Sequence, residues 1–182
     1  MSAAERDRLA QVATFTDDPS EFQRLDWRLL QNGPVVLYLR RDVLEPDLAW
    51  LQEHHYEVKW LDCLAWSDER SMHLAMASTL SFPDYYGMNL NALNDCVSDL
   101  GIPAEGGLVL VFSRFDAFSS RHEDAAQGVL DILAGNARRF LLFGRRLLIL
   151  VQSDDPRVCF APVGATAVNW NPKEWLDRNR GL

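Results

Sequence analysis

The 182-residue chain lacks several features that would place it in a specialised class of proteins. Its three cysteines, Cys63, Cys96 and Cys159, are far apart and form no C-x-x-C pair. We therefore expect no disulfide framework and no zinc site, and interpret all three as small buried hydrophobic side chains. No run approaches the roughly 20 apolar residues of a membrane span, and the first residues do not resemble a secretory signal. We expect a cytoplasmic protein without a membrane partner.

Sequence signatures of common enzymes are also missing. The chain has no G-x-S-x-G, no Walker A motif, no G-x-G-x-x-G after a strand and no H-E-x-x-H. Its four histidines include no pair spaced four apart, as a helical metal site would use, so surface or capping roles are expected for His54, His55, His73 and His122. We expect no catalytic residues, no metal and no cofactor.

Positive charge is scarce, with 18 Lys and Arg against 26 Asp and Glu and a net charge of −8. Recognition of nucleic acid phosphates requires Lys and Arg gathered on one face, so direct binding to nucleic acid is not expected. The excess of acid favours a basic partner. Residues 84–116 are especially acidic, because they contain five carboxylates and only one cation, Arg114.

The pattern of apolar residues predicts one α/β domain with additions at both ends. Short apolar runs at 35–40, 56–63, 107–112 and 147–152 are typical of strands, and segments with helical spacing lie between them, including a long helix from about His122. This alternation implies a parallel sheet with right-handed crossovers. Near the C-terminus, Asn171 and Glu174 have the spacing of a capping box for a short helix.

The segment "FPDYYGMNLNALNDC", residues 82–96, leads from an aromatic loop into a helix with a polar side. Asn89 is a suitable N-cap, and apolar residues recur at helical spacing from Leu90 to Leu100. The opposite side carries Asn91, Asn94, Asp95 and Ser98. Such a side is usually solvated, but tyrosine is enriched at interfaces, so the pattern alone leaves both a solvated face and a docking face open.

Residues 82–100 closely resemble the signature loop and second helix of the barstar family, the intracellular inhibitors of a guanyl-specific bacterial ribonuclease. The resemblance rests on the Pro-acid-Tyr-Tyr-Gly turn, the Asn-Leu entry, and the Ala-Leu and Asp-Cys pairs. It extends over about residues 56–153 and implies a three-layer fold, a parallel sheet of three or four strands with helices on both faces.

The domain boundaries follow from this resemblance. The barstar-like α/β domain covers residues 34–154 and contains an extra βα unit at 34–55. Residues 1–33 form an N-terminal helical extension, and residues 155–182 form a C-terminal extension whose short helix packs on the domain.

The resemblance further implies a protein that plugs the active site of a ribonuclease, or of a related nuclease toxin to which it gives immunity. A carboxylate placed in a basic cleft takes charge-assisted hydrogen bonds in place of a substrate phosphate. Asp95 matches the key aspartate of the family and Tyr85 an interface aromatic, while Gly87 would supply an unusual backbone angle. Tyr86 is expected to pack inward. The implied protein-binding residues are Tyr85, Gly87, Asn91, Asn94, Asp95, Ser98 and Asp99.

Three positions depart from the family pattern. Asn91 replaces an aspartate and Asn94 a tryptophan, and an acidic position of the long helix aligns with Gly135, although nearby Asp131 would partly compensate in another register. These departures favour an alternative, in which the same fold binds a partner that is not a nuclease. A third hypothesis is an enzyme that uses the tyrosines, Asp95 and Cys96 in a cleft.

Overall fold

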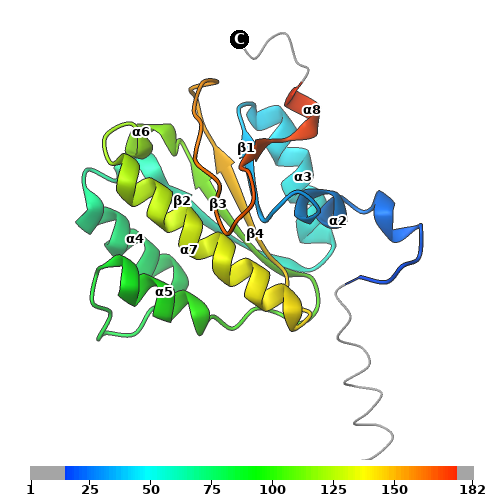
Figure 1. The fold of residues 1–182 in the computed structure, drawn as a ribbon, viewed down its shortest axis with the longest axis horizontal. Coiled ribbons are helices and arrows are strands. Elements are labelled where there is room, and N and C mark those ends of the chain that lie inside the picture. The colour runs from blue at the N-terminus through cyan, green and yellow to red at the C-terminus, as the bar shows by residue number, and fades with distance from the viewer. Residues whose placement is uncertain (1–14, 176–182) are drawn as a thin grey trace, which may run out of the picture.

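A five-stranded parallel sheet forms the centre of the computed structural model, which describes residues 15–175 (Figure 1). The strand order is β2-β3-β4-β1-β5, and every pair of neighbours is parallel. The bounds are β1 Val35–Tyr38, β2 Tyr56–Asp62, β3 Gly107–Ser113, β4 Leu147–Gln152 and β5 Asn169–Trp170. The predicted α/β fold is confirmed. The sheet has one strand more than the three or four expected. Strand β5 was not predicted, because its two residues are too few to give an apolar pattern.

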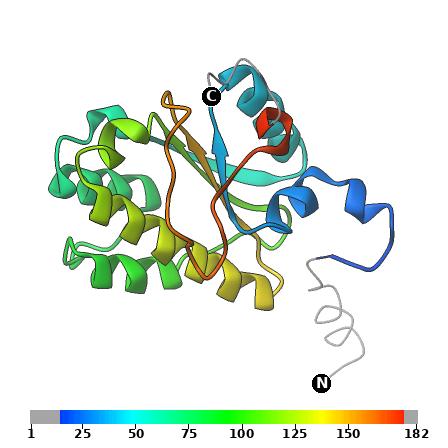
Figure 2. The same ribbon diagram turned by 45° about the horizontal axis from the view of Figure 1, so that its top comes forward.

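Helices cover both faces of the sheet, as predicted (Figures 1 and 2). One layer contains α4 Glu69–Leu80, α5 Leu90–Ser98, α6 Asp116–Ser119 and α7 Glu123–Leu142, and the other contains α2 Leu25–Leu30 and α3 Arg41–Glu53. Short elements complete the chain: η1 Glu21–Gln23, η2 Cys63–Ala65 and α8 Pro172–Trp175. The predicted helical extension over residues 1–33 lies partly outside the described residues. None of the helices in the described part is both long and apolar enough to span a bilayer.

Strand β3 shows why its sequence is apolar without alternation. All seven of its residues are buried. Leu108, Leu110 and Phe112 point to the core beneath α4, α5 and α7, whereas Val109 and Val111 point to the core beneath α3. A strand with helices on both faces buries both sides, which requires apolar residues at consecutive positions.

Helix α7 packs alongside α5, and two of its glycines have opposite environments. A Cβ added at Gly128 would lie 2.7 Å from a Leu90 methyl group, whereas a Cβ at Gly135 would meet nothing within 4 Å. We expect Gly135→Ala to stabilise the protein by about 0.5–1 kcal/mol, because alanine favours helix and fills open space here. Gly128→Ala should gain less, since Leu90 must move. Thermal unfolding of both variants tests this, and a lower melting temperature for Gly135→Ala would contradict it.

The C-terminal arm, defined as residues 154–168 between β4 and β5, lies along α7 (Figures 1 and 2). The Gln127 side chain exchanges two hydrogen bonds with the backbone of Ala161. Asp131 Oδ1 accepts from the backbone N–H of Gly164 at 2.8 Å, and Arg138 donates to the carbonyl of Gly164. The arm is thus bonded to three turns of the long helix.

The chain after the arm is tied to the added βα unit. Glu174 is buried and accepts hydrogen bonds from the backbone N–H groups of Leu39 and Arg40, at 3.0 and 2.7 Å. The N-cap half of the predicted capping box is confirmed, since Asn171 Oδ1 accepts from the backbone N–H of Lys173 at 2.9 Å. The reciprocal half is wrong, because the backbone N–H of Asn171 donates to the carbonyl of Leu37. Glu174 thus connects α8 to the chain that follows β1.

Two expectations about buried residues need correction. Of the three cysteines, Cys63 is buried, Cys96 is partly buried and Cys159 is exposed, so the interpretation as buried hydrophobic residues holds fully only for Cys63. His73 is 3% exposed, although a surface or capping role was expected. His73 lies on the inner side of α4 with Met72 and Met76, and a polar side chain at such a position gives no apolar periodicity that would indicate its burial.

Candidate protein-docking site

The aromatic loop before α5 is held in place by its second tyrosine. Tyr86 is 8% exposed, so its predicted inward packing is confirmed, and its hydroxyl lies 2.5 Å from Nδ1 of His73 on α4. Its ring centroid lies 4.9 Å from that of Phe82. Burial raises the pKa of Tyr86 to about 12, so the hydroxyl keeps its proton. With Tyr86 fixed inside, Tyr85 is directed to solvent and is 86% exposed.

The backbone of this loop differs from the prediction at one point. Met88 has the positive φ, 46°, and Gly87 does not, so the expectation that Gly87 supplies the unusual angle is wrong. A Cβ at Gly87 would lie 3.2 Å from the amide nitrogen of Asn89, which donates to the carbonyl of Gly87. Gly87 therefore allows the N-cap side chain to approach closely. The predicted N-cap is confirmed, since Asn89 Oδ1 accepts from the backbone N–H of Ala92 at 2.9 Å.

We name the predicted residues around this helix the α5 face: Tyr85, Gly87, Asn91, Asn94, Asp95, Ser98 and Asp99. All are exposed except Ser98, which is partly buried. Helical spacing places Asn91, Asn94, Asp95 and Ser98 on one side of α5. Tyr85 and Asp99 line one surface hollow together with Cys96, so the tyrosine lies toward the C-terminal end of α5. The structure thus places these residues on α5, on the loop before it and directly after it, and brings Tyr85 next to Asp99.

Members of the α5 face differ in what they can offer to another molecule. The Ser98 hydroxyl donates to the carbonyl of Asp95 at 2.7 Å, within the same helix. Asn94 Oδ1 accepts from Asn136 Nδ2 on α7 at 3.0 Å. Within residues 15–175, the side chains of Asp95 and Asn91 form no hydrogen bond or ion pair. Asp95, Asn91 and Tyr85 are therefore available for binding, whereas Ser98 and Asn94 hold α5 to itself and to α7.

Helix α7 and the arm border the α5 face on the side of Asn94, which the sequence did not indicate. Asn136 is 5% exposed and links Asn94 to the carbonyl of Ile132. Gly135 next to it is exposed and carries no side chain. Asp131 is exposed, and its Oδ1 accepts a hydrogen bond from the arm at Gly164. Arg139 on α7 donates to the carbonyl of Ser98, so this end of the surface also carries a positive charge. Compensation by Asp131 for the missing carboxylate stays a prediction.

Cys96 has little capacity as a nucleophile. Burial, together with the neighbouring carboxylates Asp95 and Asp99, raises the pKa of its thiol above the ordinary value. A thiol that stays protonated near neutral pH is a weak nucleophile. Residues 15–175 also contain no group of three or more His, Cys, Asp or Glu side chains placed to hold a metal ion. The geometry offers no support for the enzyme hypothesis.

Lowering the pH from about 7.5 to 5.5 should destabilise the protein through His73. Burial lowers the pKa of His73 below its ordinary value of 6.5. The unfolded chain therefore takes up a proton first, and stability present above about pH 6.5 is lost as the pH falls through the lower pKa of the folded state.

Urea denaturation across this pH range measures the effect of His73. His73→Gln, which has no ring to protonate, should flatten the pH dependence, whereas His55→Asn, at an exposed position, should preserve it. An equally steep dependence in wild type and His73→Gln would contradict the assignment.

The comparison with protein-family models shows to which family the chain belongs. The model of Barstar, described as barnase inhibitor, matches residues 42–152. The chain belongs to the barstar family. The match begins within α3 and includes the α5 face, α7 and the strands β2, β3 and β4, while α2, β1, β5 and the arm lie outside it.

Other comparisons add little to the barstar assignment. No curated protein matches the chain. Two solved structures of Drosophila ORC bound to Cdc6 and to AT-rich or GC-rich DNA are 16% and 14% identical, with TM-scores of 0.46 and 0.48. The chain aligns over 100% and 98% of its length and spans 64% of each of those chains. A Walker-type ATPase of Pyrococcus abyssi is 17% identical with a TM-score of 0.40, over 78% of this chain and 46% of that one. These values support no conclusion about function.

Proposed function

We propose that this barstar-family protein inhibits a ribonuclease by covering its active-site cleft, or confers immunity to a related nuclease toxin, and that it has no catalytic activity of its own. The observation that carries the proposal is the free Asp95 carboxylate on α5 beside Tyr85, which is 86% exposed. We propose that the complex forms in the cytoplasm.

The chemistry of the α5 face suits a basic cleft. The Asp95 carboxylate has no partner among the described residues, so it can accept several hydrogen bonds from Arg, Lys or His, and such charge-assisted bonds are strong when desolvated. The adjoining Tyr86 is fixed by His73, so the loop loses little freedom on binding. The net charge of −8 would speed encounter with a basic partner.

A second candidate is a partner of the same general shape that is not a nuclease. It is favoured by Asn91 and Asn94, which carry no charge, and by Arg139, whose hydrogen bond to the carbonyl of Ser98 places a cation beside the α5 face. A partner that fits this side must present few cations there. The two candidates differ in whether RNA cleavage is inhibited.

Titration of guanyl-specific ribonucleases with the purified protein tests the proposal. RNA cleavage should fall to zero at a 1:1 molar ratio, and the affinity should decrease as salt rises, because exposed charges are screened. Affinity capture from the source organism, followed by an RNA cleavage assay on the captured protein, covers nucleases outside this class. Full activity at micromolar inhibitor, together with capture of a partner without nuclease activity, would overturn the inhibitor proposal and support the second candidate.

A further inference from the structure

Strand β2 lies at one end of the sheet, beyond β3 (Figure 1). All seven of its residues, from Tyr56 to Asp62, pair with β3 in one regular register. Within residues 15–175, no other strand pairs with β2. Its outer edge therefore presents a row of backbone N–H and C=O groups that no strand of the described chain uses.

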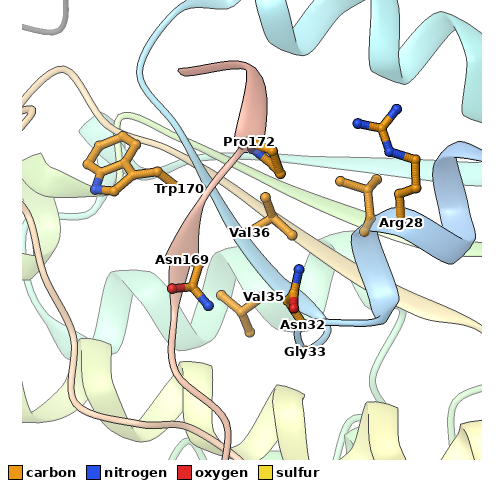
Figure 3. A pocket seen from close by; sticks show the side chains of 9 residues that line it. Arg28, Asn32, Gly33, Val35, Val36, Asn169, Trp170 and Pro172 are labelled. Atoms are coloured by element: carbon orange, nitrogen blue, oxygen red, sulfur yellow. The ribbon is translucent and has the colours of Figure 1, made fainter. Parts of the chain in front are cut away.

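The opposite end of the sheet has no comparable edge. Strand β5 is only two residues long. A cavity of about 100 Å³ beside it is lined by residues from both ends of the chain, among them Asn32, Val36, Asn169 and Pro172 (Figure 3). Native proteins protect the edges of sheets by keeping edge strands short or by placing a proline or a bulge in them. Strand β2 has none of these devices, because it is long, contains no proline and pairs with β3 without interruption.

The backbone groups of Val58 and Trp60 point away from β3. The Leu61 carbonyl accepts a hydrogen bond from Oγ of Ser113 on β3 at 3.4 Å, so the backbone groups of Leu61 face that strand. Backbone groups of successive residues in a strand point to opposite edges, which turns those of Val58 and Trp60 to the free edge. Within residues 15–175, they take part in no hydrogen bond.

The side chains of β2 leave this edge open. Glu57 is exposed, and Trp60 is 52% exposed. Lysine often protects an edge strand by its charge. Here Lys59 Nζ lies 2.7 Å from Glu57 Oε1, so residues 56–60 carry no net charge. An exposed tryptophan on an uncharged edge is typical of a binding surface, because tryptophan is enriched at interface hot spots.

The charges on β2 are complementary to those of a second copy in one register. Edge strands of two copies related by a two-fold axis pair antiparallel. When Val58 faces Val58, Glu57 lies opposite the second copy's Lys59 and Lys59 lies opposite its Glu57, which stabilises the pair. The outward backbone groups must meet, so the second copy can shift only in steps of two residues. Such a shift places Glu57 opposite Glu57 or Lys59 opposite Lys59, and like charges at facing positions destabilise the pair.

We propose that a second copy of this chain pairs with the free edge of β2, antiparallel and centred on Val58, and joins two five-stranded sheets into one. In this register the half-exposed Trp60 lies opposite the second copy's Tyr56 and is covered by it. The contact consists of residues 56–60 of each copy, so the dimer is weak, with a dissociation constant on the order of 10–100 µM. The proposal does not rest on the inhibitor function, since no residue of the α5 face belongs to β2.

Sedimentation velocity of the full chain, from about 1 µM to about 1 mM, should show a change from monomer to dimer. Lys59→Glu should raise the dissociation constant at least about tenfold, because it places like charges at both facing pairs. The exchange Glu57→Lys/Lys59→Glu restores opposite charges and should return the constant to within about threefold of wild type. Arg28→Glu is the matched control. It makes the same change of charge at an exposed position near β5, and should leave the constant almost unchanged.

Val58→Pro tests the backbone pairing. It removes an N–H that points to the free edge, so the pairing with β3 should remain while the dimer is lost. Circular dichroism shows whether the variant folds, and if it does not, the charge variants at the exposed end of the side chains keep the test valid. The proposal is overturned if wild type stays monomeric at about 1 mM, which would leave the edge to a strand of another protein. It is equally overturned if Lys59→Glu acts no more strongly than Arg28→Glu, if the charge exchange does not restore the dimer, or if a folded Val58→Pro still dimerises.

Discussion

Asp26→Ala is expected to destabilise the protein by about 3–5 kcal/mol, the usual cost of removing one member of a buried ion pair. The Asp26 side chain is 0% exposed and accepts hydrogen bonds from Arg24 Nε and Nη2 at 3.0 and 2.8 Å, from the Tyr56 hydroxyl at 2.8 Å and from Arg146 Nη1 at 2.9 Å. Without the carboxylate, Arg146 and Tyr56 would remain in a largely buried site with no anion. Helix α2 would also lose its polar link to the sheet.

Urea denaturation followed by circular dichroism measures the loss. Asp42→Ala is the matched control, because Asp42 pairs with Arg40 on the surface, where ion pairs contribute about 0–1 kcal/mol. Burial opposes the charge of Asp26, but hydrogen bonds from Arg24 and Tyr56 outweigh it and hold the pKa of Asp26 below its ordinary value. The carboxylate therefore stays ionised at neutral pH. A loss no larger than that of Asp42→Ala would show that the cluster does not hold α2 in place.

Asp95→Ala is expected to weaken binding of the partner at least about 30-fold, the effect of losing about 2 kcal/mol at an interface hot spot. The basic groups of the partner would remain buried in the interface without the carboxylate that neutralises them. The stability of the free protein should not change, because the Asp95 side chain is exposed and has no partner within residues 15–175. A large loss of affinity without loss of stability identifies a binding residue.

Glu45→Ala is the matched control for Asp95→Ala. It removes the same charge from an exposed position on α3, across the sheet from α5. It should lower the association rate slightly through the weaker overall field, whereas Asp95→Ala should mainly raise the dissociation rate. Surface plasmon resonance with the captured partner separates the two rates. Equal effects of the two substitutions would show that the partner binds another surface, whatever the partner is.

Local patterns in the sequence predicted most of the regular structure. The strands from Gly107 and Leu147 followed from uninterrupted apolar runs, and α5 followed from its apolar spacing and its N-cap, Asn89. Each of these signals involves residues only a few positions apart, because strand and helix periodicity and helix capping act over that distance. Inward packing of Tyr86 was also predicted, although from the family resemblance.

The surroundings of the candidate site depended on contacts between distant parts of the chain. Tyr86 is bonded to His73, 13 residues earlier, and Asn94 to Asn136, 42 residues later. The backbone N–H of Gly164 in the arm donates to Asp131, 33 residues earlier, which ties that carboxylate to the arm. The packing of the helices and the arm decides which polar side chains pair with each other. The spacing of residues in the sequence contains no signal for these pairings.

The sequence by itself determined the parallel α/β fold, the helix that carries Asp95, and the family to which the protein belongs. Only the tertiary structure decided that Asp95 has no partner within residues 15–175 while Asn94 and Ser98 are already bonded, and that the two ends of the chain meet to form a cavity. The physical reason is that secondary structure follows from local hydrogen bonds and the spacing of apolar residues. The availability of a side chain for binding depends instead on every neighbour that folding brings to it.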